Sequence, residues 1–184
     1  YSAYVNPFIG TGGHGHTFPG AVVPHGMIQP SPDTRIDGWD ACSGYYYADS
    51  TINGFSHTHV SGTGCCDYGD VLLMPTVGKQ QYRTTDPQSQ RLAYASSFSH
   101  KNEIAEPGYY SVFLDTYQVK AEISSTKRGA IHRYTFPENT ESGFIIDLDY
   151  SLQRQTNSEM EIEVISDTEI CGHKKTTYWA FDQY

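Results

Sequence analysis

Tyr110-Ser-Val112-Phe-Leu114 and the next apolar stretch, Val119-Lys-Ala121-Glu-Ile123, decide the fold class of this chain. Both place an apolar residue at every second position. Successive side chains of a β-strand point to opposite faces of a sheet, so this period is typical of a strand with one buried face. The turn signal Asp115-Thr-Tyr lies between the two stretches. We therefore predict two short strands that a turn separates.

The same pattern continues towards the C-terminus. Short strands at a spacing of roughly 8 to 12 residues are typical of an antiparallel sandwich. The last stretch, residues 176–184, has the pattern of a strand that simply stops, which indicates that the native polypeptide continues. The further strands that we expect lie at residues 131–136, 144–148 and 160–164.

The composition favours a single loop-rich β domain over residues 1–184. The chain has 17 glycines, 9 prolines and 14% aromatic residues but only 18% charged residues, which suits such a domain better than a helical bundle. No linker or repeat divides the chain. Three shorter elements are expected: a strand within residues 22–30 that prolines close, a buried strand that begins near Asp70, and a helical turn near residues 90–95.

Charge and hydropathy exclude several classes of partner. The net charge is -9 and the pI is near 5.2, which argues against binding to nucleic acid. No apolar run approaches the roughly 20 residues that a membrane span needs. Four cysteines are too few for a disulfide scaffold and leave the redox compartment open.

A second stretch, Asn53 to Pro75, reads NGFSHTHVSGTGCCDYGDVLLMP and concentrates reactive side chains on a glycine-rich segment. If residues 55–60 are extended, Phe55, His57 and His59 point to one face and the two imidazoles stand side by side. The glycines that follow permit positive φ or close backbone approach, so this loop can lie against a ligand.

Histidine spacing raises the alternative of a metal site. His14 and His16 repeat the spacing of His57 and His59, and imidazole and thiolate groups are good ligands for zinc or iron. In the simpler interpretation, the histidines cap loops and donate hydrogen bonds to backbone carbonyls. The other candidate ligands are His25, Asp67, Asp70 and the cysteines.

Two catalytic interpretations are incomplete, because each lacks a residue that its mechanism needs. Cys65 with His57 or His59 is a conceivable nucleophile and base, but no orienting residue or oxyanion motif accompanies them. Glycoside hydrolysis needs two carboxyl groups at a defined separation. No pair stands out among the candidate aspartates, Asp33, Asp37, Asp40, Asp67 and Asp70.

Trp39 lies between Gly38 and Asp40 on a predicted loop. An indole face beside carboxylates and imidazoles suits sugar recognition, because a pyranose ring presents C–H patches for stacking and hydroxyls for hydrogen bonds. A tryptophan in this position can equally fill the core.

Several stretches together resemble one family. They look like the N-terminal domain of glycoside hydrolase family 92, the calcium-dependent exo-acting α-mannosidases common in Bacteroidetes. The match runs through nearly the whole chain in order. The stretches that carry it are Tyr4-Val-Asn-Pro-Phe-Ile-Gly-Thr, Pro24-His-Gly-Met, Asp37-Gly-Trp-Asp, residues 54–65, residues 67–75 and Glu106-Pro-Gly-Tyr-Tyr.

The resemblance implies an antiparallel β-sandwich of the galactose-mutarotase-like supersandwich type, truncated at its C-terminal edge. It also implies a downstream (α/α)6 barrel that carries the catalytic carboxylates and most calcium ligands, so that this chain holds no catalytic residue and no metal ligand and is inactive alone. The whole protein is then an inverting exo-α-mannosidase, with α-1,2-linked mannose of N-glycans or mannans as the expected substrate. Its expected location is periplasmic, cell-surface or secreted.

By the same resemblance, loops of this domain line the rim of a mannose pocket. Trp39 is expected to pack on the sugar, and the other expected substrate-binding or loop-supporting residues are Asp40, His57, His59, Cys65 and Asp67. One departure concerns Cys66, where the family usually has glycine. Two other hypotheses remain: a free-standing carbohydrate-binding module and a histidine-rich metalloenzyme.

Overall fold

The computed structural model describes residues 1–62, 64–80, 82 and 89–179, and within them nearly all regular structure is β. All strand pairings are antiparallel. One sheet has the order β1-β3-β4-β9, the second has the order β2-β5-β6-β7-β8, and β10 pairs with β11 alone. The strands are β1 (Ser31–Asp33), β2 (Thr51–Ile52), β3 (Gly54–Ser56), β4 (Leu72–Val77), β5 (Ser96–Glu106), β6 (Tyr109–Leu114), β7 (Val119–Ser125), β8 (Ala130–Thr135), β9 (Ser142–Asp147), β10 (Thr156–Ser166) and β11 (Glu169–Thr177).

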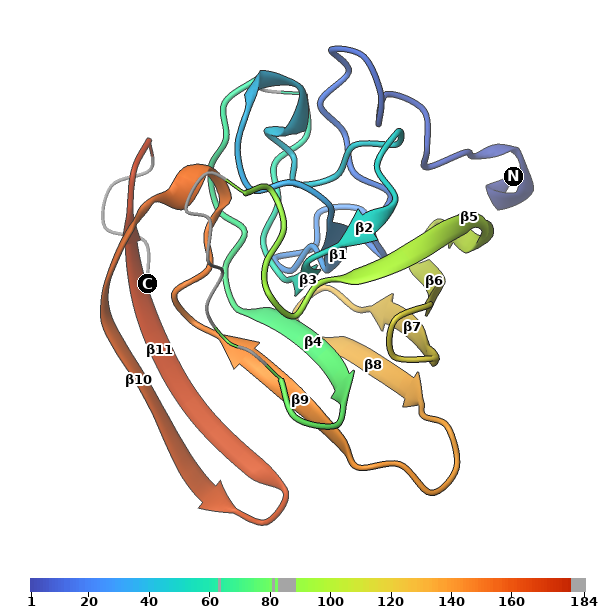
Figure 1. The fold of residues 1–184 in the computed structure, drawn as a ribbon. Coiled ribbons are helices and arrows are strands. Elements are labelled where there is room, and N and C mark those ends of the chain that lie inside the picture. The colour runs from blue at the N-terminus through green and yellow to red at the C-terminus, as the bar shows by residue number, and fades with distance from the viewer. Residues whose placement is uncertain (63, 81, 83–88, 180–184) are drawn as a thin grey trace.

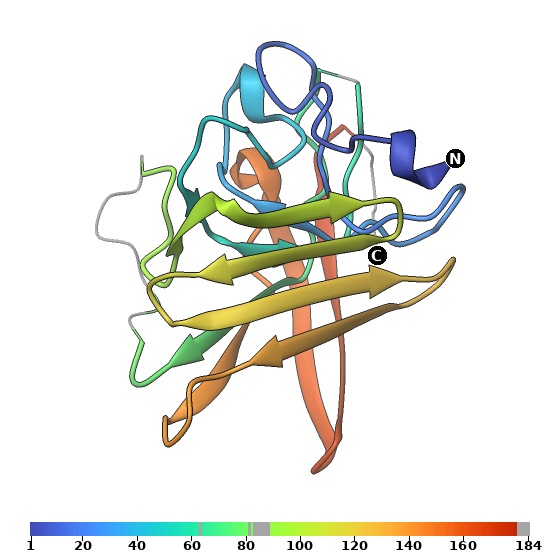
Figure 2. The same ribbon diagram turned by 90° about the vertical axis from the view of Figure 1, so that its right-hand side faces the viewer.

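The register of β6 and β7 builds one face of the core. Tyr110 lies opposite Ile123 and Val112 opposite Ala121, and all four are buried. Phe55 of the other sheet packs edge-on against the Tyr110 ring at 6.4 Å between centroids, so the two sheets share one apolar core. Figure 2 shows the larger sheet in front of the rest of the molecule. The predicted antiparallel sandwich is confirmed.

The predicted strands of the second half are confirmed with small changes in their bounds, but three other local predictions are wrong. Residues 22–30 contain a turn and a bend rather than a strand, and His25 there has a positive φ of 58°. Residues 90–95 contain bends and a turn, not a helical turn. Extended structure near Phe55 ends at Ser56, because the chain bends to bring His59 back against the Ser56 hydroxyl. Of the predicted final strand, residues 176 and 177 belong to β11, and residues 180–184 lie outside the described part.

The hairpin β10–β11 extends away from the sandwich, in orange and red in Figure 1. One of its faces carries exposed apolar side chains, including Ile162, Val164 and Ile170. Its base is anchored by Lys174, whose buried Nζ donates to the Tyr150 carbonyl at 2.7 Å and lies 2.9 Å from Asp70 Oδ1. None of the helices among the described residues is long and apolar enough to span a membrane.

Candidate functional site

Trp39 begins the short 3₁₀-helix η2 (Trp39–Ala41), directly after Gly38 at φ 107°. Its indole is 62% exposed, so it does not fill the core. The His16 ring meets it edge-on, with 4.8 Å between centroids and an interplanar angle of 88°. The indole is therefore exposed to solvent, while the His16 ring packs against it.

The glycine-rich loop packs against this tryptophan. A Cβ on Gly64 would lie 2.8 Å from Trp39 Cη2, so only glycine allows this close approach. The neighbouring Gly62 donates its N–H to the His16 carbonyl at 2.6 Å, and Ser43 Oγ donates to the same oxygen at 2.6 Å. Gly62 and Gly64 of the glycine-rich loop thus meet the loop of residues 10–17 at Trp39.

Polar side chains lie next to Trp39 on this surface. Asp40 follows Trp39 on η2, and its Oδ1 lies 2.5 Å from His14 Nδ1. Cys65 is half-buried on the glycine-rich loop. We call the surface formed by His14, His16, Trp39, Asp40, Gly64 and Cys65 the tryptophan rim.

Cys66 is buried beside Cys42 in the core next to the tryptophan rim. Its Sγ donates to the Gly38 carbonyl at 3.6 Å. Burial raises the pKa of the Cys66 thiol to about 12 and also raises that of Cys42. Both groups are therefore thiols at neutral pH. Because a cysteine nucleophile needs the thiolate form, we assign them a structural role in supporting the loop that carries Trp39.

His59 is part of a buried polar cluster rather than of the rim. Its Nε2 lies 2.8 Å from Asp33 Oδ1 and 3.1 Å from Ser56 Oγ, and its Nδ1 donates to the Gln29 carbonyl at 2.7 Å. The side chains of His59 and Asp33 are 0% exposed. Serine and carboxylate share one ring nitrogen here, whereas a catalytic triad uses opposite nitrogens, so this cluster is structural.

His57 joins the two sheets through a chain of hydrogen bonds. Its Nδ1 donates to the Val71 carbonyl at 2.7 Å, which leaves Nε2 as an acceptor for the His132 Nε2–H at 3.1 Å. The His132 Nδ1 then accepts the Tyr134 hydroxyl proton at 2.8 Å. Burial lowers the pKa of His57, and it lowers the pKa of His132 to about 4. Both rings are therefore neutral at pH 7.

Asp67 is also buried, and its Oδ1 accepts from the Tyr68 N–H at 2.9 Å and from Gln155 Nε2 at 3.1 Å. The six predicted residues thus divide in two. Trp39, Asp40 and Cys65 lie on the tryptophan rim, whereas His59 and Asp67 are buried in the scaffold and His57 is half-buried there. The prediction that His57 and His59 stand side by side on one surface is wrong, because β3 ends before His59.

Three rim residues were not among the predicted pocket residues: His14, His16 and Gly64. The His-x-His spacing was the available signal for the first two, but nothing local in the sequence shows that this loop folds back onto Trp39. The other aspartates considered for catalysis are engaged in the scaffold. Asp37, for example, accepts from Arg154 Nε at 3.1 Å and also from Gln90 Nε2.

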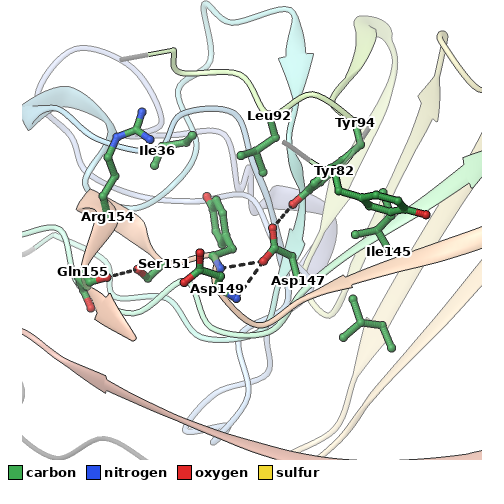
Figure 3. A pocket seen from close by; sticks show the side chains of 12 residues that line it. Ile36, Tyr82, Leu92, Tyr94, Ile145, Asp147, Asp149, Ser151, Arg154 and Gln155 are labelled. Atoms are coloured by element: carbon green, nitrogen blue, oxygen red, sulfur yellow. Dashed lines mark hydrogen bonds between the residues drawn. The ribbon is translucent and has the colours of Figure 1, made fainter. Parts of the chain in front are cut away.

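A cavity of about 680 Å³ lies elsewhere and contains none of the predicted residues (Figure 3). Among its lining residues, Asp147 has a carboxylate that accepts several hydrogen bonds. Its donors are the Tyr94 hydroxyl and the backbone N–H groups of Asp149 and Tyr150, the latter two at 2.9 and 3.0 Å. A carboxylate so fully hydrogen-bonded is a scaffold group rather than an acid or base. The described lining residues are Ile36, Tyr82, Leu92, Tyr94, Ile145, Ile146, Asp147, Asp149, Tyr150, Ser151, Arg154 and Gln155.

Residues 4–184 match the sequence model described as "Glycosyl hydrolase family 92 N-terminal domain", which places the sandwich and its tryptophan rim in a class of glycosidase domains. The chain belongs to the family of glycosyl hydrolase family 92 N-terminal domains. The resemblance that the sequence motifs carry is thereby confirmed.

Solved and curated relatives agree with this assignment. A family 92 α-mannosidase from Bacteroides thetaiotaomicron, solved alone and with mannoimidazole, is similar with a TM-score of 0.92 and 41% identity, over 98% of this chain and 24% of that one. A family 92 inverting mannosidase of the same species gives a TM-score of 0.70 and 33% identity, over 87% and 20%. An uncharacterized secreted glycosidase of Arthroderma benhamiae is 32% identical over 139 residues, 74% of this chain and 17% of the relative. The chain spans about a quarter or less of these relatives.

Proposed function

We propose that this chain is the sugar-binding N-terminal domain of an inverting, calcium-dependent exo-α-mannosidase and that the tryptophan rim forms part of its mannose pocket. The observation that carries the proposal is the exposed Trp39 indole beside the polar Asp40 and His14. An indole face with adjacent hydrogen-bonding groups suits a pyranose ring. The similarity to two solved mannosidases supports mannose as the sugar.

The proposal assigns the chemistry to a separate (α/α)6 domain that follows residues 1–184 in the polypeptide. Apart from Asp40 on the tryptophan rim, the candidate aspartates of this chain are already engaged in its scaffold, as Asp33 illustrates with its bonds to Ser56 and His59. The exposed apolar face of the β10–β11 hairpin supports packing against such a domain, because an isolated two-stranded ribbon is at best marginally stable in water. We therefore expect the 184-residue chain alone to release no mannose.

Calcium belongs to the same second domain in this proposal. Calcium prefers six to eight oxygen ligands. Among the described residues, the one group of three or more candidate ligands is His14, His16 and Asp40, which is rich in nitrogen and does not fit calcium. The residues present here therefore bind and orient the sugar, while calcium would supply electrophilic assistance at the sugar from residues outside this chain.

The proposal also covers the substrate and the location of the whole protein. We expect α-1,2-linked mannose of N-glycans or mannans to be the substrate. The location would be periplasmic, cell-surface or secreted, in line with the secreted relative from Arthroderma benhamiae.

The test is the rate of mannose release from α-linked mannobioses by the full polypeptide that contains this chain, with calcium, with chelator, and with Trp39→Ala. Release should require calcium, and the Trp39→Ala variant should lose between about twofold and about tenfold in kcat/KM, since an aromatic contact is worth about 0.5 to 1.5 kcal/mol.

Phe144→Ala is a matched control, because Phe144 is an exposed aromatic residue (57%) on β9 and lies outside the tryptophan rim. It should leave kcat/KM nearly unchanged. Absence of release from every linkage would overturn the mannosidase proposal and favour a free-standing binding module. Equal losses in the two variants would remove Trp39 from the pocket.

A further inference from the structure

We propose that His14, His16 and Asp40 form a binding site for a first-row transition metal ion such as Zn²⁺. One ligand atom from each residue lies within 4.8 Å of the other two. The three residues come from two segments, the loop of residues 10–17 and η2, so tertiary structure rather than local sequence brings them together. This proposal does not rest on mannosidase activity.

His16 supplies the second observation. The residue is only 7% exposed, and its Nε2 is buried without a hydrogen-bond partner among the described residues. A buried polar atom without a partner is uncommon and calls for an explanation such as an absent ion. Its backbone also has a positive φ of 54°, a conformation that costs energy for a residue with a Cβ. Two hydrogen bonds to its carbonyl and the edge-on contact with Trp39 hold the ring in this strained place.

The ligand chemistry selects the class of metal. Two imidazoles and one carboxylate suit zinc and its first-row neighbours, whereas calcium and magnesium prefer sites built from oxygen. Three protein ligands also leave a fourth position open on zinc.

The geometry needs only a small adjustment to accept an ion. His14 Nδ1 and Asp40 Oδ1 are 2.5 Å apart, whereas ligands about 2.0 to 2.2 Å from a shared tetrahedral ion lie somewhat farther from each other. The His14 side chain is 76% exposed and Asp40 is 36% exposed, so both can move apart towards solvent while His16 stays fixed. A bound ion would tie the loop of residues 10–17 to η2 and stabilise the base on which Trp39 stands.

Zinc binding to the full polypeptide tests the proposal. The protein is stripped with chelator, returned to excess calcium to fill oxygen-rich sites, and titrated with ZnCl₂ by calorimetry. Bound zinc is then counted by elemental analysis. The variants are His14→Ala and Asp40→Asn, whose exposed side chains can change without loss of the fold, and the control is His25→Ala, an exposed histidine outside the cluster.

The wild type and His25→Ala should bind one zinc ion more than either cluster variant, or bind it at least about tenfold more tightly, since even loss of a supporting group at a metal site costs that much. Zinc should also raise the Tm of the wild type but not of the cluster variants. The same stoichiometry and affinity in all four proteins would overturn the proposal. Because no sugar enters this experiment, its failure is distinguishable from failure of the mannosidase proposal.

Discussion

At the scale of single residues, the contact between Gly64 and Trp39 controls how the indole is presented. Both Gly62 and Gly64 have positive φ, at 75° and 66°, but a Cβ on Gly62 meets nothing within 4 Å whereas one on Gly64 meets Trp39 Cη2 at 2.8 Å. The two positions therefore share the same backbone strain and differ in steric contact. They form a matched pair.

We expect Gly62→Ala to lower the free energy of unfolding by about 1 kcal/mol through left-handed strain alone. Gly64→Ala should lower it by about 2 to 4 kcal/mol, because overpacking adds to the strain. Only Gly64→Ala should change the tryptophan emission spectrum of the folded protein. Urea unfolding and fluorescence measure both effects, and identical spectra for the two variants would contradict the close contact.

At the scale of elements, an ion pair between Lys174 and Asp70 anchors the β10–β11 hairpin. Lys174 and its neighbour Lys175 point to opposite faces of β11. Lys174 Nζ lies 2.9 Å from Asp70 Oδ1, and the two side chains are only 5% and 16% exposed. Lys175 Nζ lies 3.8 Å from Oε1 of the exposed Glu159. Both lysines thus pair with a carboxylate, but the pair of Lys174 is closer and more buried.

Lys174→Ala should lower the free energy of unfolding by about 3 to 5 kcal/mol, because it leaves the Asp70 carboxylate buried without its cation. Lys175→Ala should cost about 1 kcal/mol or less, as expected for a pair near the surface. Urea unfolding of the two variants beside the wild type measures the difference. Similar losses in both would show that the ion pair does not anchor the hairpin.

At the scale of the whole molecule, the His57–His132 pair couples the packing of the two sheets to pH. Burial holds the folded pKa of His132 at about 4, against about 6.5 for an unfolded chain, and that of His57 is lowered in the same direction. Between these two pKa values the unfolded chain binds more protons than the folded chain. The contribution of the pair to stability is therefore fully present above about pH 6.5 and is lost as the pH falls towards 4.

We expect the free energy of unfolding to fall by about 3 kcal/mol from His132 alone between about pH 7 and pH 4. His132→Gln cannot take up a proton in this range and should flatten the dependence, although it also lowers stability at neutral pH. His25→Gln changes an exposed histidine and should keep the wild-type slope. Unfolding by urea at several pH values, with chelator present, measures the slopes. An unchanged slope in His132→Gln would contradict the role of this pair.

The fold was predictable wherever one face of a strand is uniformly apolar. Strands β6 and β7 follow the alternation of Tyr110, Val112, Ala121 and Ile123 directly. By contrast, β5 was missed because it buries a carboxylate. Glu103 on that strand accepts hydrogen bonds from buried tyrosine hydroxyls, including Tyr110 at 2.6 Å. A hydrophobic pattern does not show that a buried carboxylate will find such donors.

The site was predictable only in part. Trp39 and Asp40 were identified because an indole with a neighbouring carboxylate has a recognisable chemistry, and both lie on the tryptophan rim. The opposite roles of the two His-x-His pairs were not predictable. His59 is buried against Asp33, while His14 and His16 converge on Asp40, and only long-range folding separates these outcomes.

The sequence by itself determined the β class of this protein, its family and the chemical character of its loops, because strand periodicity and local motifs are short-range properties of a chain. Only the tertiary structure decided which polar groups reach the surface. That choice depends on contacts between residues far apart in the chain, such as Gly64 with Trp39 and His16 with η2, whose formation follows from packing and hydrogen-bond satisfaction rather than from local spacing.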